Sequence, residues 1–215
     1  MVFRKSVVPF GTPLLTEKGM LANATIADLV RPSERKSALL CDAALIIGGS
    51  SLLALSAQIA VGYPIPITAQ TFAVLMIAAL LGPGRAVLCV LAYIAEGAAG
   101  LPVFAQGKAG FLVLLGPTGG YLVGFVAAAF VVGLLARNGW DRRIGTTVLA
   151  MIIGNVLIYA FGILWLSHLV GLEAALAGGL YPFIAGDLLK IVLAAAILPS
   201  AWKLLSRFGL ATPKE

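Results

Sequence analysis

The sequence of 215 residues has few charged side chains, two cysteines and a single histidine. Charged residues make up 11% of the chain and hydrophobic residues 60%, and the mean hydropathy is +1.03. A water-soluble domain of this length cannot bury so many apolar side chains. The composition therefore excludes a soluble globular protein and predicts an integral membrane protein.

The shortage of histidine and cysteine also argues against several kinds of chemistry. His168 has no second histidine with which to form a zinc site or a catalytic pair, and Cys41 and Cys89 lie in apolar runs, as packed, reduced thiols do. The segment AQGKAG is not a phosphate-binding loop, because Pro102 and Ala109 replace its first Gly and its Ser/Thr. We expect no enzymatic activity, no metal or cofactor and no nucleic-acid partner.

Long apolar runs separated by Gly- and Pro-bearing breaks are the main feature of the chain. One membrane crossing needs about 20 apolar residues, so six crossings fit this length. The second and third runs are short, which is tolerated where protein rather than lipid covers the backbone. We expect residues 101–117 to fold back into the outer part of an all-α bundle. The six runs cover residues 38–61, 68–82, 85–100, 118–136, 145–170 and 181–205.

Positive charge is distributed unevenly between the two sides of this six-helix arrangement. All but two of the 15 Lys and Arg residues fall on one side, the exceptions being Lys108 and Lys190. The positive-inside rule then places both termini in the cytoplasm of a multi-pass protein of the cell (inner) membrane. We expect a cytoplasmic N-terminal extension (1–37), a membrane domain (38–207) and a cytoplasmic tail (208–215).

The N-terminal extension has no apolar stretch of signal-peptide length, so we expect it to remain in the mature protein. Thr25 and Asp28 have the spacing of a capping box in TIADLVRPSERK. This spacing predicts a short helix, which we expect to lie at the membrane interface with its basic residues near anionic lipid headgroups.

Two opposite charges begin the last apolar run, in GDLLKIVLAAAILP. A charge within a membrane helix costs at least about 2.5 kcal/mol, so it persists where it is paired, wetted or used on a ligand. Asp187 and Lys190 are three residues apart and share one helix face near the external surface. They either neutralise each other, with Lys190 reaching for the headgroups, or form a polar clamp for a small ligand from outside, and we favour the clamp.

Further polar residues fall in the same outer half of the bundle. Singly they have simple explanations: Thr68 as a helix N-cap, Gln70 and Asn155 as bridges between helices, Tyr159 in an interfacial aromatic belt. Together they are typical of a site that fixes a polar ligand in an apolar pocket. The candidate substrate-binding residues are Asp187, Lys190, Asn155, Tyr159, Gln106, Glu96, Thr68 and Gln70.

Small residues recur at helical spacing in two of the runs, which lets helices approach closely. In the fourth run they predict internal packing. In the first run Ala44 and Gly48 fit either internal packing or the docking of a second protein. The stripe of the fourth run consists of Gly116, Gly120, Gly124 and Ala128.

Four segments in this order resemble the BioY family, the biotin-binding S components of energy-coupling factor (ECF) transporters. They are YPIPITAQTFAVLMIAALLGPGRA, AYIAEGAAGLPVFAQGKAG, LLGPTGGYLVGF and GDLLK. The resemblance covers residues 38–205 and implies a six-helix S-component bundle without enzymatic activity. It implies that biotin lies near the external surface under the loop between the first two spans, and that Asp187 and Lys190 bind it. It also implies an ECF module, made of a transmembrane coupling protein and two cytoplasmic ATPases that hydrolyse ATP.

Biotin suits these residues chemically. A carboxylate such as Asp187 accepts a hydrogen bond from a ureido N–H, while Lys190 suits either the ureido oxygen or the ligand carboxylate. Phe104, Tyr121 and Tyr159 are available as apolar walls. Two alternatives remain open: a stand-alone secondary biotin transporter driven by an ion gradient, and an S component for another vitamin.

Overall fold

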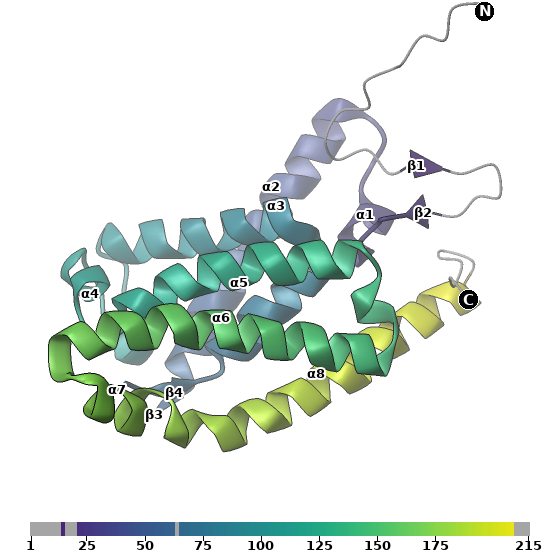
Figure 1. The fold of residues 1–215 in the computed structure, drawn as a ribbon. Helices are drawn as coiled ribbons and strands as arrows, with labels where there is room; N and C mark the ends of the chain where they lie inside the picture. Colours follow the sequence, from purple (N-terminus) through teal and green to yellow (C-terminus); the bar gives the residue numbers. More distant parts are fainter. Residues whose placement is uncertain (1–13, 16–20, 63–64, 209–215) are drawn as a thin grey trace, which may run out of the picture.

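The computed structural model describes residues 14–15, 21–62 and 65–208. Within this part of the chain, long apolar helices lie side by side in one bundle (Figure 1). A helix satisfies its own backbone hydrogen bonds, which is what a chain of this hydropathy needs in a bilayer. The long helices are α2 (Arg35–Gln58), α3 (Gln70–Ala98), α5 (Gly119–Arg137), α6 (Ile144–Val170) and α8 (Tyr181–Arg207).

Helix α3 is a hairpin that crosses the bundle twice. Gly82 interrupts it with φ 79° and ψ 176°, a conformation open to glycine alone, and Pro83 follows. The Gln70 side chain donates to the Tyr93 hydroxyl at 2.8 Å across 23 residues of sequence. A straight helix would separate these residues by about 35 Å. By length and composition, five helices of the described residues could cross a membrane. The hairpin accounts for the two short predicted runs, so the fold agrees with the predicted six-helix bundle.

Short elements connect the long helices. Strands β3 and β4 pair antiparallel between the first two crossings, with Ala60 opposite Thr68. Residues 101–117 fold back onto the bundle as predicted: the buried Phe104 ring packs edge-on against Tyr93, and the Gly110 N–H donates to the Gly97 carbonyl. The short elements are β1 (Leu14–Leu15), β2 (Leu21–Ala22), α1 (Ile26–Val30), β3 (Ala60–Val61), β4 (Ile67–Thr68), η1 (Ala105–Gly107), α4 (Leu112–Leu115), η2 (Trp140–Arg142) and α7 (Leu172–Gly179).

The small-residue stripe of α5 packs inside the bundle, as predicted. A Cβ added to Gly124 would lie 2.8 Å from the Ile158 Cα of α6, so the two backbones meet with no room for a side chain. Ala128, one turn further on, is fully buried. This close contact fixes the distance between α5 and α6.

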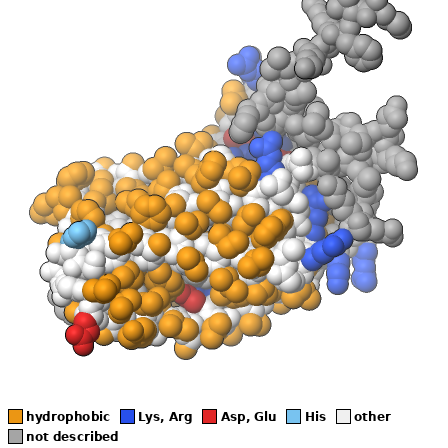
Figure 2. All heavy atoms as spheres, viewed as in Figure 1, with side chains coloured by type: hydrophobic (Ala, Val, Ile, Leu, Met, Phe, Trp, Pro, Cys, Tyr) orange, Lys and Arg blue, Asp and Glu red, His pale blue; other side chains and the backbone are white. Residues whose placement is uncertain are grey.

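Arginine side chains meet at one end of the bundle, which we call the arginine end and define by Arg31, Arg85 and Arg142. Figure 2 shows Lys and Arg side chains gathered at this end. Arg85 pairs with Asp28 at 2.8 Å and with Asp42 at 2.7 Å, and Arg31 pairs with Asp42 at 2.9 Å. These bonds tie the N-terminal segment to α2 and to the turn of the α3 hairpin.

The short helix predicted in the N-terminal extension is present as α1. The Thr25 N–H and hydroxyl both donate to the Asp28 carboxylate at 2.9 Å, so the predicted capping residues do interact. Thr25 is buried against Gly82. Helix α2 begins at Arg35, inside the expected extension. Most of the expected extension before Leu21, and the expected tail after Phe208, lie outside the described residues.

Candidate functional site

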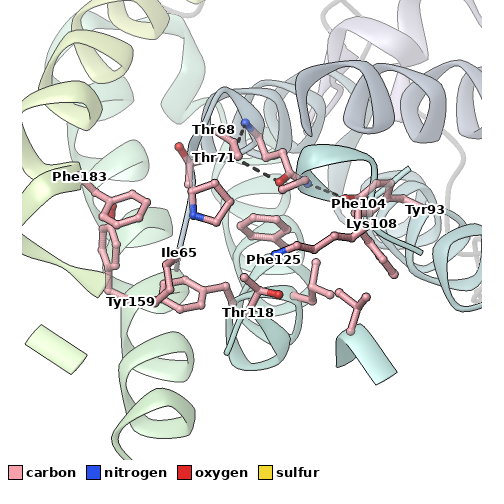
Figure 3. A pocket seen from close by; sticks show the side chains of 16 residues that line it. Ile65, Thr68, Thr71, Tyr93, Phe104, Lys108, Thr118, Phe125, Tyr159 and Phe183 are labelled. Atoms are coloured by element: carbon pink, nitrogen blue, oxygen red, sulfur yellow. Dashed lines mark hydrogen bonds between the residues drawn. The ribbon is translucent and has the colours of Figure 1, made fainter. Parts of the chain in front are cut away.

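A cavity opens at the opposite end of the bundle, which we call the cavity end; it holds about 640 Å³ of space between atoms, part of which is open to solvent. Helices α3, α5, α6 and α8 form its walls, and the loops around residues 65–68 and 104–108 cover it (Figure 3). Its lining residues are Ile65, Pro66, Thr68, Gln70, Thr71, Tyr93, Phe104, Ala105, Lys108, Val113, Thr118, Tyr121, Leu122, Phe125, Tyr159 and Phe183.

A hydrogen-bonded network around Asp187 forms one wall of the cavity. The Asp187 carboxylate, only 4% exposed, accepts hydrogen bonds from the Tyr159 hydroxyl, from Thr71 Oγ1 at 3.1 Å and from Lys190 Nζ at 3.0 Å. Lys190 Nζ also donates to Thr71 Oγ1 at 2.8 Å and to the Thr68 carbonyl at 2.9 Å. The network joins α8 to α3 and α6, and Thr68, Thr71 and Tyr159 present it to the cavity.

This network turns two hydroxyl groups into acceptors. Because Tyr159 and Thr71 each donate their only proton to Asp187, what their oxygens still offer the cavity is lone pairs. A ligand with N–H donors complements such a surface. The predicted ion pair of Asp187 and Lys190 therefore exists, but its carboxylate is also bound to residues that line the cavity. The alternative in which Lys190 reaches for the headgroups is not observed, because Lys190 Nζ donates to Thr68, Thr71 and Asp187.

Thr68 and Gln70 also line the cavity, beside this network. The Thr68 hydroxyl accepts a hydrogen bond from the Gln70 N–H at 3.2 Å. The N-cap of α3 is Ala69, so the N-cap role considered for Thr68 is not observed. The Gln70 side chain bridges to Tyr93, so the expected bridging role of Gln70 is present between the two arms of the α3 hairpin.

Three predicted site residues lie away from the main cavity. Asn155 lines a separate, smaller cavity of about 180 Å³ together with Thr71 and Lys190. Its amide donates to the Met151 carbonyl of its own helix, and its Oδ1 has no partner among the described residues, so the expected bridge to another helix is not formed. The two others are Glu96 and Gln106.

Glu96 and Gln106 are engaged outside the cavity. The Glu96 carboxylate accepts a hydrogen bond from the Ser50 hydroxyl at 2.9 Å, which joins the hairpin to α2. The Gln106 amide donates to the Gly62 carbonyl at 3.0 Å and so connects the two loops that cover the cavity. Neither side chain lines the cavity.

Several lining residues were missed in the sequence. Thr71 lies three residues after Thr68, and this spacing could have indicated a shared face. Tyr93 gave no such signal, because its place beside Gln70 depends on the α3 hairpin. Phe125 lies one turn after Tyr121, whose expected role as a wall, like that of Phe104, agrees with the lining.

Ala44 and Gly48 lie on an exposed face of α2. A Cβ added to Gly48 would meet no atom within 4 Å, so these two small residues do not serve internal packing. Large apolar neighbours on the same helix are open too, among them Leu40 at 72% exposure and Ile47 at 65%. The α2 face, defined by these four residues, is therefore available to lipid or to another protein.

A family model and individual relatives identify the same family for this chain. The model of the BioY family matches residues 29–207. The chain is 43% identical over 135 residues to the biotin transporter BioY of Thermotoga maritima, which covers 62% of this chain and 79% of that protein. It is 38% identical over 154 residues to the biotin transporter BioY of Rhizobium etli, and this match covers 67% of this chain and 82% of that protein.

A solved structure shares the fold. The crystal structure of the S-component for biotin from an ECF-type ABC transporter superposes with a TM-score of 0.64 and 24% sequence identity. The match covers 80% of this chain and 95% of that chain. The described helices thus share the fold of that protein.

Proposed function

The chain belongs to the BioY family, and we propose on this basis that it captures biotin as the substrate-binding component of a vitamin uptake transporter. It is a multi-pass protein of the cell membrane and a transport protein rather than an enzyme. The observation that carries the ligand proposal is the pair of hydroxyls, on Tyr159 and Thr71, whose protons are held by Asp187.

Biotin is chemically matched to this cavity. Its ureido group has two N–H donors, which suit the acceptor oxygens of Tyr159 and Thr71. Its bicycle and valeryl chain are apolar, and Phe104, Tyr121 and Phe183 offer apolar walls. In this proposal Asp187 and Lys190 hold the hydroxyls in place from behind the cavity wall.

The eight candidate residues have different roles in this proposal. Thr68, Gln70 and Tyr159 contact the ligand directly, and Asp187 and Lys190 fix the polarity of the wall. The other three candidates, Asn155, Glu96 and Gln106, lie outside the cavity, and we expect their substitution to weaken biotin binding less.

Titration of the purified chain in detergent tests the ligand. We expect saturable binding of biotin, weaker binding of desthiobiotin and none of lipoate or thiamine. Saturable thiamine binding without biotin binding would overturn the proposal in favour of an S component for another vitamin.

The transport partner is a second part of the proposal. We expect the α2 face around Ala44 and Gly48 to dock an ECF transmembrane coupling protein, with ATP hydrolysed by cytoplasmic ATPase subunits. The exposed small residues support this, because they let a partner helix approach closely. The gathering of Lys and Arg at the arginine end supports a cytoplasmic location for this end and for both termini.

Uptake into vesicles tests the partner. With the ECF subunits and ATP present, Gly48→Leu should abolish biotin uptake while biotin binding to the isolated chain stays intact. Gly145→Leu is the matched control, because Gly145 is equally open but lies at the start of α6. Biotin accumulation by the chain alone, driven by an ion gradient without ATP, would instead establish a stand-alone secondary transporter.

A further inference from the structure

Lys108 brings a positive charge to the cavity. Lys108 is, among the described lining residues, the one with a formal charge. It is exposed at the mouth, and Figure 3 shows its side chain extending from the loop that carries Phe104 toward Phe125 and Thr118. The cavity therefore has an acceptor-rich wall at Tyr159 and a cation at its mouth.

Lys190 is poorly placed to meet an anionic ligand. An ammonium group has three N–H donors, and Lys190 directs hydrogen bonds to Thr68, Thr71 and Asp187. The Asp187 carboxylate beside it would also repel a second anion. A ligand carboxylate must consequently find its counter-charge elsewhere in the cavity.

The loop that carries Lys108 is held in place by the protein itself. The Gly107 N–H donates to Gln58 Oε1 at 3.1 Å, and the Phe104 N–H donates to the Lys108 carbonyl at 3.1 Å. The Phe104 ring is buried against Tyr93. A loop fixed in this way loses little conformational entropy when a ligand binds. A contact from this loop therefore contributes more to the binding free energy than one from a mobile loop would.

We propose that Lys108 binds the carboxylate of the ligand at the mouth of the cavity and selects free carboxylic acids over their neutral amides. This inference rests on the proposed function and sets the orientation of biotin, with the ureido ring toward Tyr159 and the carboxylate outward. At the mouth the carboxylate keeps part of its hydration, so the ion pair avoids the desolvation cost of a buried one.

The consequence is selectivity for unconjugated biotin. A charge-assisted hydrogen bond at a partly exposed site corresponds to roughly a 5- to 30-fold difference in affinity. The amide of biotin has the same bicycle and chain but no negative charge, so it lacks only this contact. Biotin joined through an amide to a larger molecule would lose the contact as well.

Binding of biotin and of biotinamide to purified variants in detergent tests the assignment. We expect the wild-type chain to prefer biotin by about 5- to 30-fold. Lys108→Gln should lower biotin affinity to that of biotinamide and leave biotinamide affinity unchanged, and Lys108→Arg should retain the preference. Lys203→Gln, an exposed lysine at the arginine end, is the matched control and should bind both ligands like the wild type.

The outcomes separate the two proposals. An unchanged biotin affinity in Lys108→Gln, or an equal loss for biotin and biotinamide, would overturn the role of Lys108 and leave the proposed function standing. A wild-type chain that binds neither ligand would overturn the proposed function and this assignment with it.

Discussion

The two ends of the bundle both bury opposite charges, but they use them differently. At the cavity end the Asp187 carboxylate is shared between Lys190 and two hydroxyls that face open volume. At the arginine end Asp28 and Asp42 are bound by guanidinium groups that join three segments of the chain. Ion pairs thus fix the polarity of a ligand-facing wall at the cavity end, whereas at the arginine end they hold segments of the chain together.

The largest effect on biotin binding should follow from neutralising the pair at the cavity end. In Asp187→Asn with Lys190→Gln, Tyr159 and Thr71 lose the carboxylate that holds their protons. We expect biotin affinity to fall by about 1–3 kcal/mol or more, because polar groups of the buried complex are left unsatisfied. Stability should change less, since both charges of the pair are removed together. Biotin titration and thermal unfolding in detergent measure the two effects.

A stable double variant with near-native biotin affinity would contradict this use of the charges. It would show that Asp187 and Lys190 only neutralise each other. The single variants Asp187→Asn and Lys190→Gln complete the cycle and measure how strongly the two residues are coupled.

Removing Arg85 should give the opposite result at the arginine end. Arg85→Ala leaves Asp28 without its cation and Asp42 with one instead of two, in side chains at most 21% exposed. We expect a loss of about 2–4 kcal/mol in the free energy of unfolding, less than for a fully buried pair, and unchanged biotin affinity. Thermal unfolding with and without biotin measures both.

Arg35→Ala is the control for this prediction, because Arg35 is exposed at the start of α2. It should alter stability by less than about 0.5 kcal/mol. A tenfold loss of biotin affinity in Arg85→Ala would mean that the arginine end also shapes the cavity.

The crossings were the most predictable part of this protein. Apolar runs and Gly-Pro breaks placed all six within a few residues of the observed helices, including the turn at Gly82 and Pro83. The spacing of Asp187 and Lys190 also predicted their shared face. Each of these features is local in sequence, so nothing beyond the helix period was needed.

The detailed lining of the cavity could not be predicted, because it depends on how each helix is rotated. Helices that are apolar all round have no face that periodicity can single out. Asn155 and Glu96 were therefore assigned to the correct helices but not to the correct surfaces. Tyr93 was missed since its position follows from the pairing of two helix arms, which no local pattern records.

A smaller effect is expected from pH at the arginine end. Asp141, in η2 outside the crossings, is 2% exposed and accepts a hydrogen bond from Trp202 Nε1 at 2.6 Å. Burial raises the pKa of its carboxyl from 3.8 to about 6, against the opposing effects of Trp202 and the neighbouring Arg142. The folded state therefore favours the protonated form, and this contribution to stability is complete below about pH 4 and lost as the pH rises through about 6.

Asp141→Asn tests this dependence. With about 1.4 kcal/mol for each pKa unit, the wild type should lose at most about 3 kcal/mol between these pH values relative to the variant. The variant keeps an acceptor for Trp202, so it should be the more stable protein at pH 8. Unfolding temperatures across this pH range give the comparison, and parallel curves for the two proteins would exclude Asp141 as the titrating group.

The smallest effect should come from Arg31, the more exposed of the two arginines that pair with Asp42. Its side chain is 26% exposed and shares Asp42 with Arg85, so Arg31→Ala leaves the carboxylate with a cation. We expect a loss of about 0.5–1 kcal/mol, which 0.5 M NaCl should largely remove because partly exposed pairs are screened. The loss in Arg85→Ala should persist in the same salt, since that pair is more buried. Unfolding temperatures of both variants at low and high salt measure these losses. If salt removed both losses equally, burial would not distinguish the two arginines. The arginine end would then be a screened surface cluster and would not stabilise the contacts between α1, α2 and α3.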